Sequence, residues 1–242
     1  MEVSVSAEKI FSVFGIPVSN TMLTAWVVVL LLSISSYFAT RNMQKIPRGM
    51  QNFFEWAVES LFGLVESFMG DRKQTLKFFP LAATFFFFIL LSNWMGLLPG
   101  FGSIGIYEHG KFLPIFRSAT ADLNTTLAFA MISVIIIQIS GVVSLGFFKY
   151  GKKFINFSSP INFFVGLLEI ISELAKIVSF SFRLFGSVFA GEVLLVVITG
   201  LVPWIIPLPF YGLELFIGGI QAVVFMLLTV VFIKIATTEM AH

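Results

Sequence analysis

Residues 160–200 decide the fold class of this chain and read PINFFVGLLEIISELAKIVSFSFRLFGSVFAGEVLLVVITG. The stretch is about forty residues long and strongly apolar, whereas a helix that crosses a bilayer needs roughly 20 residues. A helix of this length stays within a membrane only if it is steeply tilted, bent or broken. The sequence therefore predicts a long, inclined helix inside a membrane.

A second apolar segment, residues 210–238, follows after a short interruption. Pro203, Pro207 and Pro209 lie in or near the interruption, and proline is typical of turns and of the first turn of a helix. We therefore expect the two segments to form a long, inclined helical hairpin.

Three upstream segments have the length and apolar character of single membrane crossings. They cover residues 21–40, 78–98 and 123–148. Clusters of lysine and arginine lie between the first and second crossings and after the third. Such clusters favour the cytoplasmic side, which predicts the N-terminus outside and the C-terminus in the cytoplasm.

Residues 50–69 have a different pattern, in which polar side chains recur every three or four positions between large apolar ones. That spacing is typical of an amphipathic helix at a membrane interface. The predicted fold is an all-α integral membrane protein with about five membrane-embedded helices and this interfacial helix. We expect one domain over residues 1–242, with an outer N-terminal segment at 1–20 and an outer loop at 99–122.

The composition excludes several classes of function. The chain is 57% hydrophobic and 12% charged, with a net charge of +2, so neither a soluble catalytic domain nor a nucleic-acid-binding surface fits. Cysteine is absent, and the two histidines, His109 and His242, stand far apart. We therefore expect no metal or cofactor site.

The apolar hairpin nevertheless contains ionisable residues. A charge at the bilayer centre costs about 2.5 to 3.5 kcal/mol on the insertion scale, so such residues are functional candidates by default. The alternative is that they pair with one another and hold helices together. The residues are Glu169, Glu173, Lys176, Arg183, Glu192 and Glu214.

Arg183 is the strongest of these candidates. Glu173 lies three residues before Lys176, a spacing that favours a pair within the helix. Arg183 has no acidic residue three or four positions away. Because an arginine stays protonated at physiological pH, Arg183 cannot relay protons, and we interpret it as a fixed gate.

The carboxyl groups fall into an outer and an inner set. Glu192 lies nine residues after Arg183, on roughly the opposite helix face, and Glu214 lies toward the same outer side in the next segment. Two such carboxyls can flank one outer cavity and pass protons on, which leaves Glu169 for an inner one. Gln221, seven residues after Glu214, fits either an interhelical hydrogen bond or the ion path.

Residues 181–192, SFRLFGSVFAGE, resemble the signature of the ATP synthase subunit a family. Further resemblances cover the chain from about residue 20 to residue 239. They are DLNTTL at 122–127, FPL at 79–81, SN at 92–93, GLLPG at 96–100 and GIQAVVF at 219–225.

The resemblance implies a stator in the membrane sector of ATP synthase, without catalytic residues of its own. The arginine that matches Arg183 would face the rotating ring of c subunits and separate two aqueous half-channels. Glu192 and Glu214 would belong to the outer half-channel, and Gln221 would face Arg183. The remaining assignments are Glu169 and Ser172 toward the inner half-channel, and Asp122 and Asn124 at the outer mouth.

Two positions depart from the family pattern. Ser187 stands where asparagine is common, and glutamates occupy both outer positions, Glu192 and Glu214, where many members have a histidine at one. Ser187 keeps a hydrogen-bonding group next to Arg183. We therefore do not expect a histidine-type titration to govern proton entry.

The implied partners are the c-ring, the b subunits of the peripheral stalk, the rest of the complex and membrane lipid. The absence of a presequence pattern in residues 1–20 and the Ala-Gly-Glu variant favour a bacterial inner membrane over an organelle membrane. The alternative is an independent proton-coupled secondary transporter. It would be built from inverted repeats with broken helices, which the sequence does not suggest.

Overall fold

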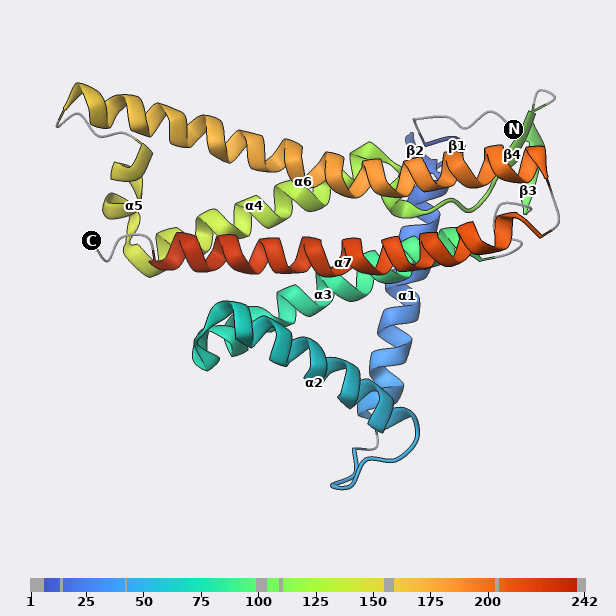
Figure 1. Ribbon diagram of the computed structural model, residues 1–242, viewed down its shortest axis with the longest axis horizontal. Coiled ribbons are helices and arrows are strands. Elements are labelled where there is room, and N and C mark those ends of the chain that lie inside the picture. The colour runs from blue at the N-terminus through green and yellow to red at the C-terminus, as the bar shows by residue number, and fades with distance from the viewer. Residues whose placement is uncertain are drawn as a thin grey trace.

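The computed structural model describes residues 7–13, 15–41, 43–98, 104–108, 111–154, 159–202 and 205–238. Within these ranges the chain is mainly helical (Figure 1). The elements are β1 (Lys9–Val13), β2 (Ile16–Ser19), α1 (Asn20–Thr40), α2 (Met50–Met69), α3 (Arg72–Leu97), β3 (Gly105–Glu108), β4 (Lys111–Pro114), the 3-10 turn η2 (Ala119–Ala121), α4 (Leu123–Leu145), α5 (Phe147–Phe154), α6 (Pro160–Leu201) and α7 (Pro207–Thr238).

Five of the helices are long and apolar enough to cross a membrane, namely α1, α3, α4, α6 and α7. This confirms the prediction of about five membrane-embedded helices. The amphipathic segment forms the separate helix α2, with the predicted bounds. Its C-terminal end is tied to α7, because the Lys234 Nζ donates a hydrogen bond to the Phe68 carbonyl oxygen at 2.9 Å.

The long apolar stretch is one unbroken helix of 42 residues, α6, which corresponds to about 63 Å at 1.5 Å per residue. Its single proline, Pro160, lies at the helix start, where a proline costs no intrahelical hydrogen bond. In Figure 1, α6 and α7 run side by side in opposite directions along the long axis, and α1 runs across them. The helical hairpin is confirmed.

Two of the predicted crossings have different bounds in the structure, and the last helix, α7, begins at Pro207 rather than at residue 210. Helix α3 starts at Arg72 rather than residue 78, because the Asp71 side chain caps it and accepts a hydrogen bond from the Lys73 backbone N–H at 3.0 Å. Helix α4 ends at Leu145 rather than residue 148, because Gly146 has a φ of 83°, a backbone conformation that ends helices. The lysine-rich segment after it is the short helix α5.

The predicted outer segments contain structure that a helical pattern does not predict. Two small antiparallel hairpins, β1–β2 and β3–β4, lie before α1 and within the loop before α4. The second hairpin is joined to the start of α1, where the Asn20 Nδ2 donates a hydrogen bond to the Pro114 carbonyl oxygen at 3.4 Å. The chain from Pro114 to α4 is therefore held against the start of α1.

The core lies between α3, α4, α6 and α7, with α2 covering one end. Phenylalanine rings fill much of it, and the rings of Phe85 and Phe225 meet edge to face with centroids 5.4 Å apart. A hydrogen bond of 2.8 Å between the hydroxyls of Ser133 and Thr229 joins α4 to α7. These contacts pack the hairpin of α6 and α7 against α3 and α4.

Met226 provides a test of this packing. Its side chain is 0% exposed in the cluster between α2, α3, α4 and α7, so Met226→Ala should leave a cavity. We expect the free energy of unfolding in detergent to fall by about 2 to 5 kcal/mol. The matched control is Leu208→Ala on the same helix, where the side chain is 65% exposed. An equal loss for both variants would contradict the packing described here.

Candidate functional site

Arg183 lies near the middle of α6 on an exposed face. Among the described residues, no acidic side chain forms an ion pair with its guanidinium. The neighbouring Ser187 Oγ donates instead to the carbonyl oxygens of Arg183 and Leu184, each at 3.1 Å. A cation in an apolar helix thus faces outward from this chain.

Small residues share the exposed face of α6 with Arg183. They are Ala175, Ser179, Gly186 and Ala190. Small side chains allow another helix to approach the backbone closely in a membrane. This face of α6 is therefore shaped for a close helical neighbour.

Glu214 faces the opposite way, into the protein. It lies in the N-terminal part of α7 and its side chain is 6% exposed. Its carboxyl group packs against Gly191 of α6 so closely that a Cβ atom at residue 191 would overlap it. The hairpin thus places Glu214 beside the residue that precedes Glu192.

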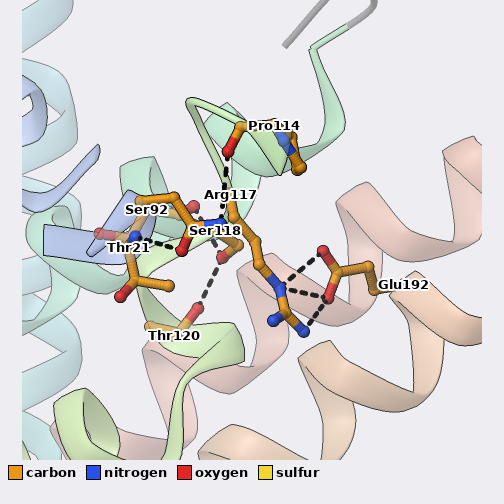
Figure 2. A network of polar contacts seen from close by, with 8 residues as sticks. Thr21, Ser92, Pro114, Arg117, Ser118, Thr120 and Glu192 are labelled. Carbon is orange, nitrogen blue, oxygen red and sulfur yellow. Dashed lines mark hydrogen bonds and ion pairs between the residues drawn. The ribbon is translucent and has the colours of Figure 1, made fainter. Parts of the chain in front are cut away.

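Glu192 forms an ion pair with Arg117, from the loop before η2. The Arg117 Nη2 lies 2.8 Å from the Glu192 Oε2, and the Nε lies 3.1 Å from each carboxylate oxygen. Figure 2 shows the guanidinium reaching from the loop to the carboxylate on α6. The Arg117 side chain is only 7% exposed and that of Glu192 is 30% exposed, so this is a partly buried, charge-assisted pair.

The loop that carries Arg117 is itself fixed by polar contacts. The Arg117 backbone N–H donates to the Thr24 Oγ1 of α1 at 3.3 Å. The Ser118 Oγ donates to the Ser92 carbonyl oxygen of α3 at 3.0 Å (Figure 2). Gly96 makes this docking possible, since a Cβ there would lie 2.6 Å from the Ser118 Cβ. The loop is therefore anchored to two helices.

Asn93 connects this loop to α7. Its Nδ2 donates to the Gly218 carbonyl oxygen at 2.9 Å, and its Oδ1 accepts a hydrogen bond from Thr120. Asn93 is buried, so both of its bonds are formed away from solvent. The position of α7 near Glu214 is thereby tied to the loop that carries Arg117.

Arg117 is not among the functional residues predicted from the sequence. It lies in the predicted outer loop of mixed charge, where a solvated arginine is the ordinary expectation. The available signal was its place five residues before Asp122, at the start of the DLNTTL segment. Its partner Glu192 is 75 residues away in the chain, so spacing alone could not pair them.

Asp122 and Asn124 lie at the start of α4. The Asp122 Oδ1 accepts hydrogen bonds from the Asn124 backbone N–H at 3.3 Å and from its Nδ2 at 3.4 Å. Both residues line a cavity of about 500 Å³ between α1 and α4, and Lys9 and Ser19 also border it. The two residues predicted for an outer mouth thus share one hollow.

The inner carboxyls are paired with lysines. The Lys153 Nζ of α5 lies 2.8 Å from the Glu169 Oε1 and 3.9 Å from the Glu173 Oε1. The Lys176 Nζ lies 2.8 Å from the Glu173 Oε1, which confirms the predicted pair within the helix. Ser172 is exposed in the same turn of α6.

The remaining candidate, Gln221, is half-buried on α7. In the part of the chain that the structure describes, its side chain makes no hydrogen bond with another residue. The same part contains no group of three or more His, Asp or Glu side chains placed to hold a metal ion. Of the two histidines, neither lies within the described ranges.

Comparison of the sequence with known proteins identifies the family of this chain. The family model described as "ATP synthase A chain" matches residues 22–234. A protein from Campylobacter jejuni subsp. doylei named "ATP synthase subunit a" is 39% identical over 219 residues, which cover 89% of each chain.

A protein of the same name from Moorella thermoacetica is 36% identical over 225 residues, which cover 93% of this chain and 94% of that protein. The residues matched by the family model include the loop that carries Arg117, all of α6 and most of α7, and the similarity covers 89% and 94% of the two relatives. The chain therefore belongs to the ATP synthase A chain family.

Proposed function

We propose that this chain is the stator subunit of the membrane sector of an F-type ATP synthase and provides two proton half-channels against the rotating c-ring. The observation that carries the proposal is Arg183, an exposed cation near the middle of an apolar helix, with no acidic partner among the described residues. A charge in this position requires an opposite charge or water. A carboxylate brought by a moving partner would supply it.

Arg183 would act as an electrostatic gate. An arginine stays charged and favours the ionised form of a carboxylate beside it, so a ring carboxyl that reaches Arg183 releases its proton. The small residues on the same face let a ring helix come close enough for this contact. The released proton leaves on one side, and the ring carboxylate takes up the next proton on the other.

The two half-channels would open to opposite sides of the membrane. Glu192 and Glu214 would line the outer one, with Asp122 and Asn124 at its mouth. The inner set would be Glu169 and Ser172. Gln221 would face Arg183 across the hairpin, and Ser187 would lie one turn from the gate.

The chain would act only within an assembly. Its partners would be the c-ring, the b subunits of the peripheral stalk and the remaining subunits, in a bacterial inner membrane with the N-terminus outside and the C-terminus in the cytoplasm. The chain would contribute no catalytic residue, because ATP chemistry would take place on other subunits. Its own part would be the proton path.

The outer carboxyls give a direct test. We expect Glu192→Gln and Glu214→Gln each to slow ATP-driven proton pumping, since we assign both side chains to one half-channel and Glu214 contacts Gly191, the residue before Glu192. The activation free energy of pumping should rise much less in the double variant than the sum of the two single-variant increases. The reason is that the effects of substitutions in one network do not add. Additive losses would argue for two separate sites. Acidification of vesicles by the assembled complex is the measurement.

One experiment distinguishes the stator model from the alternative, an independent secondary transporter. Proton flux is measured in liposomes that contain either the chain alone or the complete complex. The stator model predicts ATP-coupled flux from the complete complex alone. Coupled transport of a solute by the isolated chain would contradict the stator model and favour the transporter.

A further inference from the structure

We propose that Arg117 is a positioning residue of the outer half-channel, which holds Glu192 as a fixed, ionised partner and leaves Glu214 as the carboxyl that carries protons there. The proposal deepens the function proposed above and rests on it. It assigns different roles to two glutamates that the sequence presents as equivalent. It also gives the pathway a second arginine, distinct from the gate.

The geometry of the pair supports a fixed role for Glu192. The Arg117 Nε and Nη2 both donate to the carboxylate, at 3.1 and 2.8 Å, and such two-point contacts restrain orientation as well as charge. Arg117 is almost fully buried, and a buried arginine without a counter-ion is strongly unfavourable. Protonation of Glu192 would leave that charge unpaired.

The loop is anchored to two helices, and this anchoring restricts movement of Arg117 while protons pass. Its backbone is bonded to Thr24 of α1, and the next residue, Ser118, is bonded to α3. The guanidinium therefore reaches α6 from a loop whose backbone is anchored (Figure 2). Arg183 differs in this respect, because it is exposed on the other face of α6 and open to a moving partner.

Glu214 has the opposite character. Among the described residues, its carboxyl has neither a cationic partner nor a hydrogen bond, and it packs against Gly191. Arg117 from the loop pairs with Glu192, whereas Glu214 from α7 contacts the preceding residue of α6, Gly191. Arg183 lies nine residues back on α6, and Asp122 is engaged at the start of α4. Glu214 is the carboxyl free to gain and lose a proton without breaking an ion pair.

The test is a set of variants in the complete complex, with ATP-driven proton flux expressed per assembled complex. Arg117→Gln and Glu192→Gln each leave the other charge of the pair without its partner and should each lower the flux about tenfold or more. The double variant Arg117→Gln with Glu192→Gln leaves no unpaired charge and should recover roughly half of the wild-type flux or more. Arg117→Gln combined with Glu214→Gln should show no such recovery.

A second readout separates positioning from mere stabilisation. The flux is measured against the pH of the proton-uptake compartment. Arg117→Gln removes the positive charge that pairs with Glu192 from the proposed outer half-channel and should move the midpoint upward by about one pH unit. Arg117→Lys and the double glutamine variant should keep the wild-type midpoint, since the local net charge is unchanged. An unmoved midpoint in Arg117→Gln would mean that Arg117 serves stability alone and would overturn the proposal.

The decisive contrary result is an assembled double variant that pumps no better than Glu192→Gln, because Glu192 would then itself carry protons. A second double variant serves if the complex with Arg117→Gln and Glu192→Gln assembles poorly. Arg117→Met with Glu192→Leu replaces both charged side chains by apolar ones, an exchange that proteins often tolerate. The proposal would also be overturned if neither double variant assembled into the complex better than the single variants Arg117→Gln and Glu192→Gln. Retained pumping by Arg183→Ala would instead contradict the stator function itself.

Discussion

Arg183→Ala is expected to abolish ATP-driven proton pumping while the complex remains assembled. The guanidinium is exposed on α6 and makes no ion pair within the described residues, so its removal should cost little packing inside this chain. Without the fixed charge, nothing would favour the ionised form of a ring carboxyl at this point. The proton could then cross with the ring or leak between the half-channels.

Proton flux, ATP hydrolysis and subunit content are measured in the same membrane vesicles. The matched control is Arg72→Ala, where the arginine side chain is 73% exposed and pairs with Glu66 at 3.5 Å near the interfacial helix. An exposed pair of this kind contributes about 0 to 1 kcal/mol, so the control should pump normally. Coupled pumping by Arg183→Ala would refute the gate.

Gly191→Ala is expected to reduce pumping nearly as severely, although it adds a single methyl group. The new Cβ would overlap the Glu214 carboxyl, and both helices are held by packing and by the bond from Asn93 to Gly218. Glu214 would have to leave its place beside α6. The carboxyl that we assign to proton transfer would be displaced from the outer half-channel.

Gly200→Ala is the matched control for this substitution, because it adds the same atom to the same helix at a position with no neighbour within 4 Å. Proton flux per assembled complex should fall at least tenfold in Gly191→Ala, on the scale of a misplaced catalytic group, and remain unchanged in Gly200→Ala. Equal flux in both variants would show that the contact between Gly191 and Glu214 has no role in translocation.

In the function that we propose, the two arginines would have different tasks in the proton path. Arg183 faces outward from the chain and is open to a partner, whereas Arg117 faces inward and is already paired with Glu192. The first arrangement suits a contact that forms and breaks as a ring turns. The second suits a site that must keep its shape while protons pass.

Much of the architecture followed from the sequence. Hydrophobic length predicted the crossings, the excess length of residues 160–200 predicted one long helix, the prolines after it predicted the hairpin, and periodicity predicted α2 with its observed bounds. The pair of Glu173 with Lys176 was predictable because it lies within one helix. Boundaries were less predictable where a single residue decides them, as Asp71 does for α3 and Gly146 for α4.

The sequence by itself determined the membrane location, the number of long helices and the unusual charge of Arg183, because these depend on hydrophobicity and on spacing within one helix. Only the tertiary structure decided that Arg117 pairs with Glu192 and that Glu214 packs against Gly191. The first contact joins residues 75 positions apart, and both depend on how a loop and a second helix pack against α6. Short-range periodicity carries no information about such contacts, since they join different elements and depend on tertiary packing.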